Sequence, residues 1–214
     1  MIVRLFFWIV PLLVMGFHSA MAAATLGLNY TTIHYQQFRT DYQGKAITLK
    51  ASHSLIGRKF EYSSNGYVTV VPFSQNRDVD MRFVGANLRG GYAFVSKPKV
   101  RVSLLLGVYY VTTFVKDDLF GYQNFWGPQV TPSFVWYASS KLTLGLYGKY
   151  STVADGSSGL FGNRELAAGF QLQFGGKSSR PIALTFDFAS LEVTIGTVRA
   201  ESRTLSSGFS FGLF

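Results

Sequence analysis

Six charged side chains lie in segments whose other residues mostly alternate between apolar and small polar types. In each segment the charge falls in the polar phase, beside Gly, Ser, Thr, Asn or Gln. These residues are Arg89, Arg101, Lys141, Lys149, Glu165 and Asp187. A charge withdrawn from water needs a partner, because an unpaired buried charge is costly. The set therefore indicates either a salt-bridged network that fills an interior or a narrow basic path for ions or small polar solutes.

Lys149 and Glu165 give this interpretation its sharpest form. They flank a Gly/Ser segment at 154–163, and each lies in the polar phase of its own segment. If the two segments form a hairpin, the two side chains lie at similar heights on neighbouring strands, with Asp187 near the same level one strand further on. We therefore predict that Lys149 and Glu165 form an ion pair inside the protein.

Catalytic chemistry has little support in the sequence. Nucleophilic catalysis needs a nucleophile, a base and an orienting group within hydrogen-bond reach. Beyond residue 22 the histidines are His34 and His53, and His53 lies between two serines. Adjacent residues of a strand point to opposite faces, so neither flanking serine can share the face of His53. We expect no enzyme, no metal site and no cofactor.

The elements that carry these charges follow a period of two, as β-strands do. From residue 81 onward the alternation defines seven strands at 82–95, 100–111, 129–136, 141–150, 165–174, 182–188 and 204–213. The connections alternate between long and short. This is the expectation for hairpins that cross a membrane with long loops outside and tight turns in the periplasm.

Residues 23–80 alternate less clearly. We expect three strands there, at 25–38, 46–60 and 67–73, with a turn at 63–66 and a competing turn at 57–59. Both termini on one side require an even number of strands. The prediction is therefore ten strands, with eight as the alternative if this segment forms a loop or a plug.

Composition separates a membrane barrel from a soluble sandwich. Only 14% of the residues are charged, 16% are aromatic, 22 are glycine and none is cysteine. Aliphatic residues lie in mid-strand, whereas aromatic residues lie at both expected membrane edges, as in an interfacial girdle. The girdle comprises Tyr92, Phe94, Trp136 and Phe174 at the periplasmic edge, and Tyr110, Tyr150 and Phe188 at the outer edge. The fold class is an all-β, closed antiparallel transmembrane β-barrel.

The N-terminus has the features of a cleavable signal peptide. Arg4 precedes an apolar run at 5–17, and Ala20, Met21 and Ala22 give the small-x-small cleavage pattern. A run of that length is shorter than the ~20 residues of a membrane-spanning helix. We expect a signal peptide at 1–22, with cleavage after Ala24 as second choice, and a barrel at 23–214. Removing Arg4 leaves 19 basic and 11 acidic residues, and thus a net charge of 19 − 11 = +8.

Residues 23–214 resemble the small Gram-negative outer-membrane barrels with the architecture of the OmpA membrane domain. The sharpest element is a C-terminal aromatic residue, Phe214, after an alternating last strand, although Phe214 is out of phase with Phe209, Phe211 and Leu213. The resemblance implies an outer-membrane location and recognition of Phe214 by the barrel-assembly machinery, with help from periplasmic chaperones. It also implies contact with outer-membrane lipids, including lipopolysaccharide, and a monomeric state.

Three functional classes remain open. The leading one is a structural or surface-interaction barrel with a plugged lumen, for which an aromatic loop at 116–127 and the loop at 154–163 are the outer surfaces. The second is a small porin-like channel, favoured by interior glycines that reduce filling: Gly85, Gly91, Gly107, Gly145, Gly169 and Gly208. The third is a lipid-modifying or proteolytic enzyme that depends on His34 or His53. Basic residues are spread over turns and interior, which does not fit a nucleic-acid-binding face.

Overall fold

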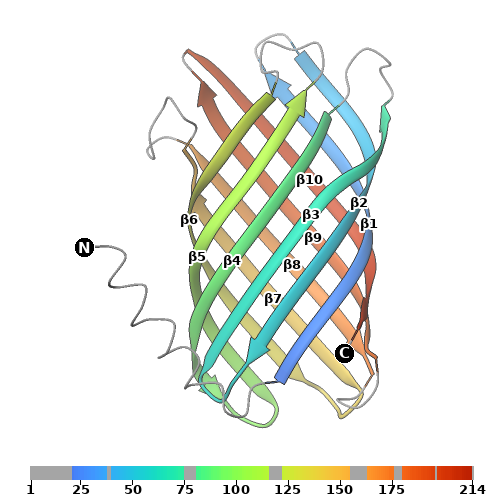
Figure 1. The fold of residues 1–214 in the computed structure, drawn as a ribbon, viewed down its shortest axis with the longest axis vertical. Helices are drawn as coiled ribbons and strands as arrows, with labels where there is room; N and C mark the ends of the chain where they lie inside the picture. Colours follow the sequence, from blue (N-terminus) through green and yellow to red (C-terminus); the bar gives the residue numbers. More distant parts are fainter. Residues whose placement is uncertain are drawn as a thin grey trace, which may run out of the picture.

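The computed structural model describes residues 21–37, 40–74, 81–115, 122–154, 163–175, 180–195 and 197–213. They form ten strands: β1 (Met21–Gln37), β2 (Thr40–Ile56), β3 (Phe60–Ser74), β4 (Met81–Ser96), β5 (Val100–Val115), β6 (Tyr122–Tyr137), β7 (Leu142–Thr152), β8 (Arg164–Phe174), β9 (Ile182–Ile195) and β10 (Val198–Gly212). Each strand pairs antiparallel with its chain neighbours, and β1 pairs with β10, so the sheet closes (Figure 1). The prediction of a closed ten-stranded barrel is confirmed, and the eight-strand alternative is wrong.

The strands are strongly tilted. Tracing register partners from Ala22 through the other nine strands returns to β1 at His34, an offset of 34 − 22 = 12 residues. With a rise of ~3.3 Å per residue and a strand spacing of ~4.8 Å, this offset tilts the strands by about 40° from the barrel axis. Such a tilt lies in the usual range for closed barrels.

β1 begins and β10 ends at the same end of the barrel, the lower end in Figure 1, as an even strand count requires. β1 starts at Met21, so the expected cleavage after Ala22 would fall near its first residues. Residues 1–20 and Phe214 lie outside the described part of the chain, and the expected signal peptide and assembly signal remain predictions. Within the described residues no helix is long and apolar enough to cross a membrane.

The turn between β2 and β3 corrects one prediction. It lies at 57–59, where the amide of Gly57 donates to the carbonyl of Phe60 over 2.9 Å, and not at 63–66. Ser63 and Asn65 belong instead to β3. They face the interior and accept hydrogen bonds from Arg89 (3.1 Å) and Asn87 (2.8 Å) on β4. Small polar residues here therefore line the barrel rather than mark a turn.

The outward faces of the strands are apolar through the middle of the barrel. Leu106, Leu184 and Phe186 are exposed, and so are the girdle residues Phe94, Tyr110, Trp136, Tyr150, Phe174 and Phe188. Tyr92, also in the girdle, is half-buried because the ring of Phe60 packs on it edge-on, with 5.6 Å between centroids. An apolar surface that encircles the molecule would be unfavourable in water, whereas it is the surface that contact with lipid requires.

Near the upper end the alternation continues but its polarity inverts. On β1, Ile33 and Tyr35 are buried inside, whereas Thr32, His34 and Gln36 face outward. β9 continues to Ile195 and β10 starts at Val198, so most of the predicted final loop at 189–203 is strand and that prediction is wrong. Above the apolar band the outward side chains are polar and the inward side chains are apolar and packed. A strand end predicted from the last outward apolar residue therefore comes too early.

Candidate functional site

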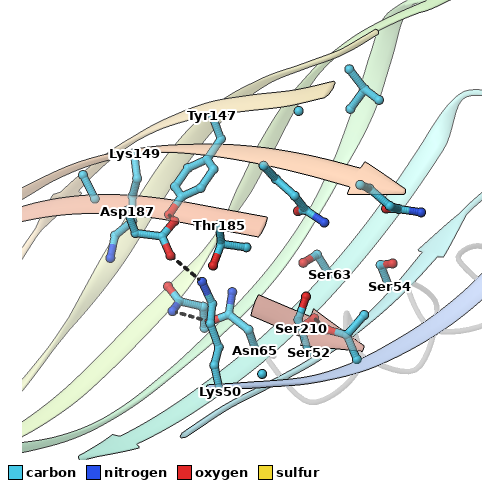
Figure 2. Close-up of a pocket in the computed structure, with 18 of the residues that line it drawn as sticks. Lys50, Ser52, Ser54, Ser63, Asn65, Tyr147, Lys149, Thr185, Asp187 and Ser210 are labelled. Carbon is cyan, nitrogen blue, oxygen red and sulfur yellow. Dashed lines mark hydrogen bonds and ion pairs between the residues drawn. The ribbon is translucent and has the colours of Figure 1, made fainter. Parts of the chain in front are cut away.

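A cavity of about 1030 Å³ occupies the barrel interior (Figure 2). It extends from turn residues such as Lys97 and Ser139 to Phe83 and Val111 near the upper end. Its walls are mainly Ser, Thr, Asn, Gln and Tyr, with isolated charges. The polar phase of the strands thus forms an interior wall, as the sequence indicated.

Lys149 and Glu165 lie in this wall on adjacent strands β7 and β8. The ammonium nitrogen of Lys149 is 2.8 Å from Oε2 of Glu165, and the two side chains are 7% and 6% exposed. The same nitrogen lies 3.4 Å from the centre of the Tyr109 ring on β5. The predicted ion pair is present, and a cation–π contact supplements it.

Asp187 has a partner that sequence reasoning missed. Its Oδ2 lies 2.9 Å from the ammonium nitrogen of Lys50 on β2, and Tyr147 donates to its Oδ1 over 2.7 Å. Figure 2 shows the side chains of Lys50 and Asp187 reaching toward each other across the cavity. Lys50 belongs to the segment whose alternation was unclear, so its inward phase could not be assigned from the sequence.

Arg101 is held near the lower end by groups on the β2–β3 hairpin. Its Nε donates to Oε2 of Glu61 (3.2 Å) and its Nη1 to the carbonyl of Gly57 (3.1 Å). Ser103 donates to the same carboxylate oxygen over 2.9 Å. Glu61 was also missed, because the predicted turn at 63–66 left it without an assigned face. The cluster fastens the hairpin turn to β5.

Two of the predicted interior charges behave differently from these pairs. Arg89 lines the cavity and donates to Ser63, but its Nε has no hydrogen-bond partner, and among the described residues Arg89 makes no ion pair. Lys141 is exposed and precedes β7, so its assignment to the interior is wrong. The carbonyl of Lys141 still accepts from the amide of Gly175, but its side chain lies in the exposed turn where the amide of Ser139 donates to the carbonyl of Leu142.

Two of the interior glycines, Gly85 and Gly169, do not leave the space that their small size suggested. A Cβ on Gly85 would lie 2.2 Å from the ring of Tyr67, and a Cβ on Gly169 would lie 2.1 Å from the ring of Tyr147. Each tyrosine on a neighbouring strand therefore lies over a glycine and fills the volume of the missing side chain. These glycines permit close packing of aromatic rings and are not evidence for an open channel.

The upper end of the interior is packed with apolar side chains. This group, the upper apolar cluster, consists of Ile33, Tyr35, Tyr42, Ala46, Met81, Phe83, Tyr109, Val111, Phe125, Val153, Val193 and Ala200. Phe125 is 0% exposed, although it belongs to the segment that was predicted as an aromatic outer loop. β6 begins at Tyr122, so only 116–121 of that loop, with 155–162 of the next, lie outside the described residues.

Charged residues also gather on the outer wall above the apolar band. Glu192 accepts from Arg164 through both oxygens and from Arg199 over 2.9 Å, and Arg203 pairs with Glu201. These residues lie on β8, β9 and β10. Arg199, Glu201 and Arg203 are spaced by two, as on one face of a strand. This signal was overlooked when 189–203 was predicted as a loop.

The two histidines lie on the outer wall, and neither enters the cavity. His34 is 2.9 Å from Asp41, and the ring of His53 meets that of Tyr62 edge-on at 6.3 Å. In the described part of the chain, no three His, Asp or Glu side chains converge as a metal site needs.

Comparison with known proteins places this geometry in a wider class. No protein-family model and no curated protein matches the sequence. The outer-membrane protease OmpT from Escherichia coli has a similar structure, with a TM-score of 0.60, 10% identity and coverage of 91% of this chain and 96% of that chain. This chain has the fold of a bacterial outer-membrane β-barrel. At such identity the likeness concerns the fold and not proteolysis.

Two further outer-membrane barrels match over most of their length. Neisserial surface protein A has a TM-score of 0.43 and 12% identity, with coverage of 89% of this chain and 98% of that chain. OprG from Pseudomonas aeruginosa has a TM-score of 0.41 and 10% identity, with coverage of 90% and 95%.

Proposed function

We propose that the chain is an outer-membrane barrel with a lumen closed to solutes and a structural or surface-interaction role, exported by a signal peptide at 1–22. The single observation that carries the proposal is the upper apolar cluster. Tyr35, Tyr42 and Phe125 are almost completely buried within it. With the short turns in the periplasm, this cluster lies at the outer end of the lumen, where a solute would have to enter.

The charges below the cluster support the same conclusion. Conduction needs a continuous wet path, and an apolar constriction gates a pore by excluding water. Lys149 and Lys50 are neutralised by Glu165 and Asp187, and these pairs project into the space that a solute would use. In this proposal the cavity communicates with the periplasm, and the described residues of the upper apolar cluster separate it from the outside.

A small porin-like channel is the second candidate. It is favoured by the volume of the cavity, about 1030 Å³, and by Arg89, which carries an unpaired charge into it. This function requires the upper apolar cluster to separate. A catalytic role has less support, because the contacts of His34 and His53 are to Asp41 and Tyr62. We further propose that periplasmic chaperones escort the chain, that the barrel-assembly machinery inserts it, and that it is a monomer.

Single-channel recording of refolded residues 23–214 in a planar bilayer tests the proposal. The parent protein should be silent, with folding verified in the same sample. The double variant Tyr42→Ala and Phe125→Ala removes two rings of the cluster and should produce discrete conductance steps. Phe186→Ala, which removes an exposed ring from the lipid-facing wall, is the control and should stay silent. Reproducible steps in the parent would establish the channel instead.

A further inference from the structure

We propose that a pocket on the outer wall binds the phosphorylated headgroup of an outer-leaflet glycolipid of the lipopolysaccharide type. The pocket has a volume of about 410 Å³ and is formed by β1, β2, β9 and β10. We call it the wall pocket, and the residues that matter are His34, Gln43, Lys45, Phe188, Arg203 and Leu205. The inference depends on the proposed membrane orientation but not on whether the lumen conducts.

Strand register brings the basic residues together. His34 on β1 is the partner of Arg203 on β10 and of Gln43 on β2, and Lys45 is the partner of Thr32. All of them face outward, opposite to the buried side chains of Ile33 and Tyr35. Two strand spacings across the sheet and an offset of two residues along it put the backbones of Lys45 and Arg203 about 12 Å apart. Long basic side chains on both sides of such a gap can contact one phosphate or the two ends of a phosphorylated sugar.

The charges of the wall pocket favour an anion. No Asp or Glu lines the pocket. Lys45 is exposed and makes no ion pair with the described residues. Arg203 donates through Nε to Glu201, which leaves its two terminal nitrogens available. His34 lies between these two basic residues in the pocket wall, with its Nε2 2.9 Å from Oδ1 of Asp41. Guanidinium and ammonium groups are the usual ligands of phosphate oxygens.

The lower side of the wall pocket favours a lipid over a soluble phosphate. Phe188 and Leu205, which line it, are 44% and 57% exposed and lie at the upper edge of the apolar band. An amphiphile whose phosphate meets Lys45 and Arg203 would lay its acyl chains against these two side chains and the band below. A free anion would leave that apolar surface uncovered.

Native mass spectrometry of the refolded barrel in neutral detergent, titrated with a bisphosphorylated lipid A, tests the inference. The double variant Lys45→Gln and Arg203→Gln should bind at least about tenfold more weakly, since two charge-assisted hydrogen bonds to the phosphate are lost. The matched control, Arg58→Gln and Lys141→Gln, removes the same two charges from exposed turns at the other end and should bind like the parent. The same lipid without phosphates should bind weakly to every variant, and inorganic phosphate should not compete.

Three results would overturn the inference. Equal loss in both double variants would mean non-specific attraction to net charge. Equal binding of the phosphate-free lipid would mean apolar contact alone, and efficient competition by inorganic phosphate would mean an anion site without lipid specificity. Conductance of the same preparations is recorded separately, so a barrel that conducts and still binds through Lys45 and Arg203 refutes the closed lumen and retains the lipid site.

Discussion

Lys149 and Glu165 meet diagonally across the β7–β8 hairpin. The register partner of Lys149 is Ala167 and that of Glu165 is Ser151, so the pair is offset by two residues, yet its charged atoms are 2.8 Å apart. Both side chains lean toward one another within the interior wall. Because they are almost fully removed from solvent, neither can exchange its partner for water.

Exchange of the two charges should therefore preserve the barrel better than either reversal alone. Lys149→Glu and Glu165→Lys each leave two like charges buried, and each should destabilise by roughly 3–5 kcal/mol or block folding. The double exchange restores the pair but places a carboxylate against the face of Tyr109, so recovery should be incomplete. Urea unfolding in phospholipid vesicles measures all three. An exchange as damaging as the two reversals combined would contradict the pairing.

Much of the fold was predictable because lipid imposes a strict contrast between the two faces of a strand. Leu104, Leu144 and Leu184 lie in segments where that contrast is clear, and all seven strands predicted after residue 81 are present. On β3, by contrast, Ser64 and Gly66 occupy the outward phase, and on β2 His53 does so. Polar or small residues in the outward phase weaken the contrast between the two faces. The inward orientation of Lys50 and Glu61 could therefore not be predicted.

Close approach of two backbones should make Gly107 intolerant of substitution. A Cβ there would lie 1.9 Å from the carbonyl oxygen of Leu88 and 2.8 Å from Cα of Arg89, so β4 and β5 would have to separate. Gly107→Ala should destabilise by about 1–3 kcal/mol, as overpacking does. Gly145 is the matched control, because its nearest neighbour would be Cβ of Gln171 at 3.8 Å.

Unfolding curves of the two alanine variants decide this prediction. Gly145→Ala should unfold like the parent, within roughly 0.5 kcal/mol. Equal effects at the two positions would mean that the strands adjust to a new Cβ at either place, and close backbone approach would not explain Gly107.

Replacement of Asp187 should lower the stability of the barrel more than replacement of Tyr147, although the two side chains share a hydrogen bond. Tyr147→Phe removes one bond to a charged group, roughly 1.5–3 kcal/mol, and leaves the contact of Asp187 with Lys50 intact. Asp187→Asn also leaves the ammonium group of Lys50 without its counter-charge inside the barrel. We expect the larger loss of stability in Asp187→Asn, measured by urea unfolding.

A double-mutant cycle separates the charge effect from packing. Adding Lys50→Gln to Asp187→Asn should cost little, since the cation that lost its partner is then gone. If the two losses simply add, Lys50 and Asp187 are independent, and the ion pair does not stabilise the barrel.

The contacts of Arg101 require a guanidinium group rather than a positive charge alone. Its Nε and Nη1 reach Glu61 and the carbonyl of Gly57 in different directions, within a site where Arg101 is only 5% exposed. A lysine ammonium is a single point and cannot span both acceptors. Arg101→Lys should therefore destabilise the β2–β3 hairpin nearly as much as Arg101→Gln. Lys99→Arg, in an exposed turn, should have no effect.

Limited trypsin digestion gives this prediction a local readout. Arg58 and Lys59 lie in the turn that Arg101 holds, and they are exposed cleavage sites once the turn loosens. Arg101→Lys and Arg101→Gln should both be cut there faster than the parent, whereas Lys99→Arg should not. Cleavage of Arg101→Lys at the parental rate would mean that charge alone holds the turn, because the lost carbonyl contacts would then contribute nothing to its closure.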